Sequence, residues 1–98
     1  MKANFLLGSL KITAEARQAL KRLPYDLLAR HAINEHGHIS REEALCNRRG
    51  MKTLGAIISR YLADPTDPGA GTVLISTRPG WQETRIEIQQ SKVPVTRI

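Results

Sequence analysis

The spacing of apolar and polar residues predicts a strand and three short helices in the first half of the chain. Apolar side chains alternate with small or polar ones where a strand is expected, and they recur every three or four positions where a helix is expected. Pro24 separates the first two helices, because a helix tolerates proline only in its first turn. The expected elements are a strand over residues 5–12 and helices over residues 14–23, 24–36 and 41–53.

The third helix has the clearest start signal. Ser40 and Glu43 stand at the spacing of a capping box, in which the serine accepts from the Glu43 amide and the glutamate accepts from the serine amide. The side chains expected to face inward from the second and third helices are Tyr25, Leu28, Ala29, Ala32, Ala44, Leu45 and Met51.

The second half of the chain has the pattern of an antiparallel meander. Three runs rich in β-branched or alternating apolar residues are separated by a loop of turn formers and by the dipeptide Pro79-Gly80. The expected strands cover residues 56–62, 72–78 and 84–89.

Together these elements predict an α+β fold: an N-terminal strand, three short helices, and then a three-stranded antiparallel meander packed on the helices. A chain of 98 residues has room for one core. We therefore expect a single α+β domain over residues 1–90 and an extended C-terminal tail over residues 91–98.

Charge narrows the range of partners. Fifteen Lys and Arg against nine Asp and Glu give a net charge of +6, which favours a polyanionic partner such as nucleic acid. The single cysteine, Cys46, cannot form an internal disulfide and fits a reducing compartment. The chain shows neither a signal peptide nor an apolar run long enough to span a bilayer, so we expect a cytoplasmic protein with no membrane partner.

Basic side chains recur at helical spacing on two of the expected helices. A stripe of this kind can follow a phosphate backbone, although it can equally be the solvated side of an amphipathic helix. The residues of these basic faces are Arg17, Lys21, Arg41, Arg48, Arg49 and Lys52.

Arg78 and Trp81 flank the expected turn between the last two strands. Arg and Trp are enriched at the energetic centres of interfaces, so this turn is a second candidate binding element. The alternative is that Trp81 folds back over the sheet edge and fills the core.

The three histidines are the only cluster of metal-ligand type. His31, His36 and His38 lie near Cys46 and several glutamates, but their spacing matches no standard zinc pattern. Cys46 lacks the context of an activated nucleophile. We therefore expect no metal, no cofactor and no catalytic residue, and we keep a metal-dependent enzyme built on the histidine cluster as an alternative.

A series of short motifs runs without a gap through residues 5–88. It includes Phe5-Leu6-Leu7-Gly8, Arg30-His31 and Ser59-Arg60-Tyr61, and it resembles a family of short plasmid- and phage-borne proteins, often labelled as a restriction-modification subunit, whose pattern reads F-x-L-G, R-H-x-x-G-D-W-G and L-S-x-Y. Asn34, Glu35 and His36 stand where that pattern has Gly, Asp and Trp. The residues placed at motif positions are Arg30, His31, Glu35, Gly37, Asn47, Ser59 and Tyr61.

Arg30 and His31 allow two interpretations. They could form a paired donor site for phosphate or carboxylate, with arginine supplying a bidentate fork. In the structural interpretation, which we favour, Arg30 pairs with Glu35 or Glu43 and His31 either caps a helix or packs inside the protein.

The expected function is that of a non-enzymatic binding protein. The resemblance implies a mobile-element accessory protein, and the charge favours nucleic acid or a host protein complex that handles nucleic acid, which would include an inhibitor of bacterial defence. Besides the metal-dependent enzyme, the alternative is a structural or regulatory oligomer, such as a homodimer, formed by pairing of an exposed sheet edge.

Overall fold

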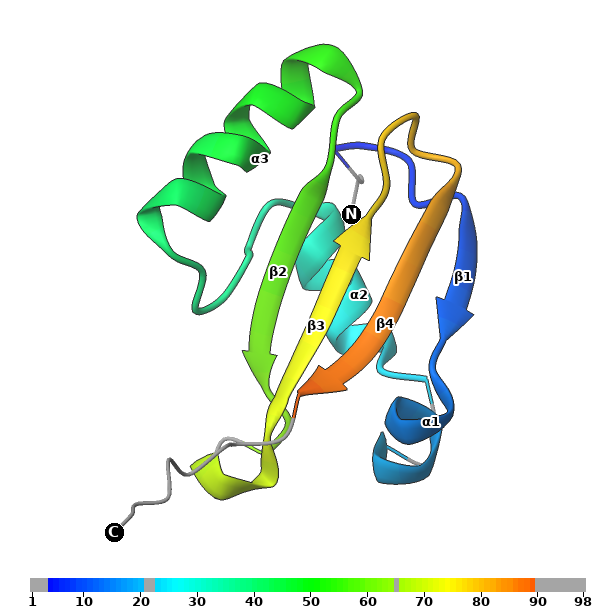
Figure 1. Cartoon of the computed structure of the whole chain (residues 1–98), viewed down its shortest axis with the longest axis vertical. Coiled ribbons are helices and arrows are strands. Elements are labelled where there is room, and N and C mark those ends of the chain that lie inside the picture. Colours follow the sequence, from blue (N-terminus) through cyan, green and yellow to red (C-terminus); the bar gives the residue numbers. More distant parts are fainter. Residues whose placement is uncertain (1–3, 21–22, 65, 90–98) are drawn as a thin grey trace, which may run out of the picture.

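The computed structural model describes residues 4–20, 23–64 and 66–89 and shows an α+β fold with three helices and a four-stranded mixed sheet (Figure 1). The elements are β1 (Ser9–Ile12), α1 (Ala14–Leu20), α2 (Tyr25–Ala32), α3 (Arg41–Thr53), β2 (Ile57–Leu62), the short 3-10 helix η1 (Pro68–Ala70), β3 (Thr72–Thr77) and β4 (Glu83–Gln89).

The expected meander is present, but the N-terminal strand extends it. Strands β2, β3 and β4 pair antiparallel in sequence order, and β1 adds to β4 in parallel, which gives the order β1-β4-β3-β2. The amide of Ser9 donates to Gln82 O and the amide of Thr13 donates to Ile86 O, so the β1 ladder is closed at both of its ends. The sheet is therefore mixed, with β1 and β2 as its two edges.

Helix α2 covers one face of the sheet, α1 contacts β4, and α3 lies alongside the β2 edge (Figure 1). The core lies between the sheet and the first two helices. Ile75 and Ile86 are fully buried there, and Leu28 of α2 and Ala16 of α1 pack onto them. Burial of this aliphatic surface is the main term that holds the helices on the sheet.

The first strand and the second helix are shorter than the sequence pattern predicts. The strand starts at Ser9 because Gly8 has a positive φ of 68° and lies so close to the Gln82 backbone that a Cβ would meet it at 2.2 Å. Helix α2 ends at Ala32, and Asn34 follows with a left-handed φ of 66°.

Three residues predicted to face inward, Tyr25, Ala29 and Leu45, are exposed instead. Tyr25 and Leu45 keep 68% and 48% of their surface accessible. Tyr25 is the first residue of α2, and α3 packs mainly on β2, so only a narrow side of each helix is covered. The expected tail over residues 91–98 lies outside the described residues.

The outer edge of β2 is closed by groups from outside the sheet. The amide of Arg60 donates to His36 O, and Arg60 O accepts from the His38 amide, while Asn47 holds the backbone of Ile58. An edge whose backbone groups are satisfied in this way cannot readily accept another strand. Self-pairing, the basis of the oligomer hypothesis, would therefore have to use the β1 edge.

No helix in the described part of the chain is long and apolar enough to cross a bilayer.

Candidate nucleic-acid interface

Helix α3 places its basic residues on the side that faces away from the sheet. Positions separated by seven and four residues fall on one line of a helix, and the three residues with this spacing, Arg41, Arg48 and Lys52, are all exposed. Arg49, beside them, is exposed as well. The opposite side of α3 carries Asn47 and Gly50, which are buried against β2.

These cations lack acidic partners among the described residues. Of the two glutamates of α3, Glu43 is bound to Arg60 at 2.7 Å, and this contact holds the pKa of the Glu43 carboxyl below its usual value. Glu42, seven residues before Arg49, is exposed on the basic side of the helix but forms no ion pair among the described residues. Arg30 and Arg85 pair with Glu35 and Glu83 at 3.5 and 3.2 Å. Arg30, Arg60 and Arg85 are thus paired with carboxylates, whereas the four cations of α3 form no ion pair among the described residues.

The turn between β3 and β4 is fastened to the C-terminal end of α3 (Figure 1). The Gly80 amide donates to Leu54 O at 2.7 Å, and the Trp81 Nε1–H donates to Gly55 O at 2.9 Å. Arg78, exposed in this turn, therefore lies at the same end of the molecule as the last turn of α3. The turn between β3 and β4 therefore lies beside the end of α3.

The backbone at this junction is strained. Leu54, the C-cap of α3, and Trp81 both adopt left-handed conformations, with φ of 57° and 56°. The left-handed conformation costs a residue with a Cβ about 1–2 kcal/mol, and residues with such strained backbones concentrate at functional positions. The two hydrogen bonds across the junction hold this conformation in place.

Two leucines belong to the same surface, and the sequence analysis missed both. Leu45 lies four residues after Arg41 and three before Arg48, and Leu54 is 55% exposed. The spacing of Leu45 relative to the arginines was the available signal, because it places the leucine on the basic side of the helix. We call the set the α3 surface: Arg41, Leu45, Arg48, Arg49, Lys52, Leu54 and Arg78.

Trp81 belongs to the interior of the junction. Its ring centroid lies 5.5 Å from that of Phe5, which is buried, and its indole N–H is used on Gly55 O. Of the two interpretations of Trp81, folding back onto the protein is the one that the structure shows. The exposed cation of this turn is Arg78.

The other predicted basic pair does not join the α3 surface. Arg17 is exposed on α1, which packs on β4, whereas α3 packs on β2 at the opposite edge of the sheet. Lys21 lies outside the described residues. The basic faces of the two helices are therefore separate features.

The motif residues gather around β2 and hold the fold together. The Arg30 guanidinium lies 4.8 Å from the centroid of the Tyr61 ring, and the Tyr61 hydroxyl donates to Glu35 O at 2.6 Å. Gly37, with φ of 73°, approaches Arg60 O so closely that a Cβ would meet that oxygen at 2.1 Å. The paired donor site suggested for Arg30 and His31 is not formed, because His31 is fully buried.

His31, Ser59 and His36 are part of a hydrogen-bonded chain through the core. Ser59 Oγ lies 2.6 Å from His31 Nδ1 and 2.7 Å from His36 Nδ1, and His31 Nε2 lies 2.9 Å from Thr77 Oγ1. Thr77 continues the chain to the Thr84 hydroxyl at 2.7 Å. Thr84 ends it by donating to Leu7 O at 2.6 Å.

The carbonyl at the end of the chain decides the direction of every bond. A carbonyl only accepts and each hydroxyl has one proton, so Thr84 gives its proton to Leu7 O, and Thr77 must give its own to Thr84. His31 Nε2–H then donates to Thr77, and because burial lowers the pKa of His31 to about 3, its Nδ1 accepts from Ser59. His36 Nδ1–H donates to Ser59 in turn.

This order leaves His31 without a free ring nitrogen that could bind a metal ion. Both nitrogens of His31 are used internally, and the described residues contain no group of three His, Cys, Asp or Glu side chains that could hold a metal ion. Cys46 is exposed on α3. The alternative enzyme based on the three histidines therefore finds no assembled site in the described part of the chain.

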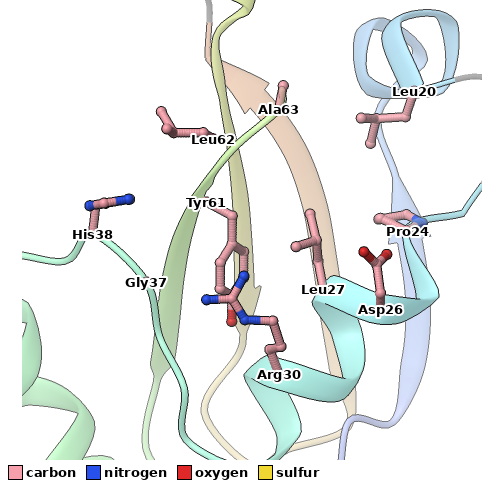
Figure 2. Close-up of a pocket in the computed structure, with 10 residues that line it drawn as sticks. All are labelled: Leu20, Pro24, Asp26, Leu27, Arg30, Gly37, His38, Tyr61, Leu62 and Ala63. Carbon is pink, nitrogen blue, oxygen red and sulfur yellow. The ribbon is translucent and has the colours of Figure 1, made fainter. Parts of the chain in front are cut away.

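A pocket of about 380 Å³ opens between α2 and β2, on the other side of β2 from α3 (Figure 2). Leu20, Leu27 and Leu62 line its apolar part, and Figure 2 shows the Arg30 guanidinium beside the Tyr61 ring. The charged groups at its rim, Asp26 and Arg30, are exposed. The pocket is thus an open depression whose wall is held by the Arg30–Tyr61 contact.

Comparison of the chain with protein-family models, with curated proteins and with solved structures found no match. The resemblance of residues 5–88 to a family of plasmid- and phage-borne proteins therefore stays a prediction.

Proposed function

We propose that the chain is a non-enzymatic protein that binds nucleic acid through the α3 surface. The observation that carries the proposal is the set of five exposed cations, Arg41, Arg48, Arg49, Lys52 and Arg78, that have no acidic partner among the described residues. Phosphate contacts supply most of the affinity of non-specific nucleic-acid binding. An uncompensated basic surface of this kind suits a polyanion.

The remaining surfaces support this choice by their chemistry. On the sheet face opposite α2, Arg60 is bound by Glu43 and Gln89, and Arg85 is bound by Glu83. Guanidinium groups that already have partners gain less from a phosphate. The α3 surface is therefore the best-placed candidate in the described part of the chain.

The resemblance to plasmid- and phage-borne proteins supports a role in a mobile element. On that basis we propose an accessory role in which the protein acts on host nucleic acid, with a host complex that handles nucleic acid as the alternative partner. A defence inhibitor would belong to either class.

The direct test is fluorescence anisotropy with a labelled nucleic acid, on the wild type and on two variants of equal charge. One variant carries Arg48→Ala, Arg49→Ala and Lys52→Ala, and the control carries Lys11→Ala, Arg17→Ala and Arg85→Ala, all exposed or half-buried residues away from α3. We expect the first to lose at least tenfold in affinity and to reduce the slope of log K against log salt by about 3, since each phosphate contact contributes about 0.9 to that slope.

The control variant should keep its affinity within about threefold and its salt slope nearly unchanged. If both variants lost affinity equally, the net charge of the protein alone would explain binding of the probe. That result would contradict the assignment of binding to the α3 surface. A different result would favour the alternative partner. In that case the wild type would bind no nucleic acid but would bind a host complex, and the Arg48, Arg49 and Lys52 variant would not bind that complex.

A further inference from the structure

Resting on the proposed function, we infer that the nucleic acid is double-stranded DNA and that α3 enters its major groove. The α3 surface presents cations and exposed leucines and lacks aromatic rings, and this combination indicates the kind of nucleic acid that it binds.

Single strands are disfavoured because the α3 surface has no aromatic side chain. Proteins that bind single strands stack bases on exposed aromatic rings. The chain has four aromatic residues, all of them described. Phe5 and Tyr61 are buried, Trp81 turns toward Gly55 O, and Tyr25 is exposed on α2, a different helix. A basic surface without a stacking ring recognises a backbone and grooves rather than splayed bases.

The shape of the surface is a single projecting helix. Helix α3 has 13 residues, and among the described elements it packs mainly on β2. Its length is about 20 Å, and a helix with its side chains is about 10–12 Å across. The major groove of B-DNA, about 12 Å wide, admits such a helix. The major groove of A-form RNA is too narrow and deep for one.

The order of residues along the exposed line fits this placement. Arg41, Arg48 and Lys52 lie on one line of the helix, and Leu45 lies beside that line between Arg41 and Arg48. Arginine and lysine can bind phosphates or guanine edges, and an apolar side chain can contact the methyl group of thymine. An exposed leucine among arginines has a use in a groove that phosphate binding alone would not require.

Arg78 provides a contact outside the groove. The turn that carries it is held on the end of α3 by the Gly80–Leu54 and Trp81–Gly55 hydrogen bonds. A cation fixed beyond the end of a groove-bound helix is positioned to contact the flanking phosphates, and such contacts set the orientation of the helix on the duplex.

The test is competition against a labelled 20-base-pair DNA duplex by three unlabelled probes of equal length: the same duplex, its single strand, and a double-stranded RNA. We expect the DNA duplex to compete at least tenfold better than either other probe. Equal or better competition by the single strand or the RNA would overturn the inference and leave nucleic-acid binding intact. Failure of the labelled duplex and of directly labelled single strand and RNA to bind would remove the proposed function itself.

Dimethyl sulfate distinguishes the two grooves, because it methylates guanine N7 in the major groove and adenine N3 in the minor groove. We expect the protein to protect guanine N7 within its binding site. Protection confined to adenine N3 would place the protein in the minor groove and overturn the assignment of α3.

Leu45→Ala tests the contact with the thymine methyl group. The variant should stay folded, because Leu45 is exposed. The wild type should bind a duplex of adenine and thymine about two- to threefold more tightly than the same duplex with uracil in place of thymine, and Leu45→Ala should bind both equally. Equal binding of the two duplexes by the wild type would rule out the methyl contact.

Discussion

Asn47 holds the backbone of Ile58 with both groups of its side-chain amide. Its Nδ2–H donates to Ile58 O at 2.8 Å, and its Oδ1 accepts from the Ile58 amide at the same distance. The side chain thus takes the place of a neighbouring strand at the β2 edge. Together with the Glu43–Arg60 ion pair, it links α3, which carries the basic surface, to the sheet that supports it.

Asn47→Ala should destabilise the protein by about 2–4 kcal/mol, because it leaves two partly buried backbone groups without partners. Urea unfolding followed by circular dichroism measures the change. Cys46→Ala, an exposed neighbour on the same helix, is the control and should alter the free energy of unfolding by less than about 0.5 kcal/mol. A similar small effect for Asn47→Ala would show that α3 does not depend on this link.

The buried histidine predicts a loss of stability in mild acid. Burial lowers the pKa of His31 from 6.5 to about 3, with His36 as a smaller cause, and the pKa of His36 is lowered by burial too. The unfolded chain therefore binds these protons at a higher pH than the folded protein does. The stabilising contribution of His31 is complete above pH 6.5 and decreases as the pH falls toward 3.

At pH 5 the His31 contribution alone should be smaller by about 2 kcal/mol than at pH 7, at about 1.4 kcal/mol per pH unit. Urea unfolding across pH 4.5–7.5 measures it. A stability that is flat across this interval in the wild type would refute the buried neutral imidazole.

The hydrogen-bonded chain predicts the tautomer of each histidine at neutral pH. His31 should carry its proton on Nε2, and His36 should carry its proton on Nδ1, because the chain must end by donating to Leu7 O. Two-dimensional ¹⁵N–¹H spectra of the imidazole rings distinguish the two tautomers directly. A proton on His31 Nδ1 at pH 7 would reverse the inferred direction at Ser59.

The left-handed C-cap of α3 predicts that the same substitution has opposite effects at two exposed leucines. Leu54 has a φ of 57°, where glycine is free of the strain that a Cβ causes, so Leu54→Gly should stabilise the protein by up to about 1 kcal/mol. Leu45→Gly, inside the helix, should destabilise it by about 1 kcal/mol. Thermal unfolding compares the two variants, and a destabilising Leu54→Gly would show that its side chain contributes packing that outweighs the strain.

The sequence by itself determined most of the local structure. The capping box predicted helix α3 over residues 41–53, and the structure confirms those bounds together with both hydrogen bonds of Ser40 and Glu43. Apolar alternation predicted β2, β3 and β4 to within one residue at each end. Such features depend on neighbours within a few residues, and that information is present in the chain itself.

Tertiary structure alone decided how distant segments meet. The parallel addition of β1 to β4, the hydrogen bond from Thr84 to Leu7, and the contact of the Arg78 turn with Leu54 each join residues that are far apart in sequence. The same is true of His31, whose motif position did not show that Ser59 and Thr77 would use both of its nitrogens. Pairings of this kind are selected by the burial of the whole core and by the need to satisfy every buried polar group, and neither requirement can be read from a short window of sequence.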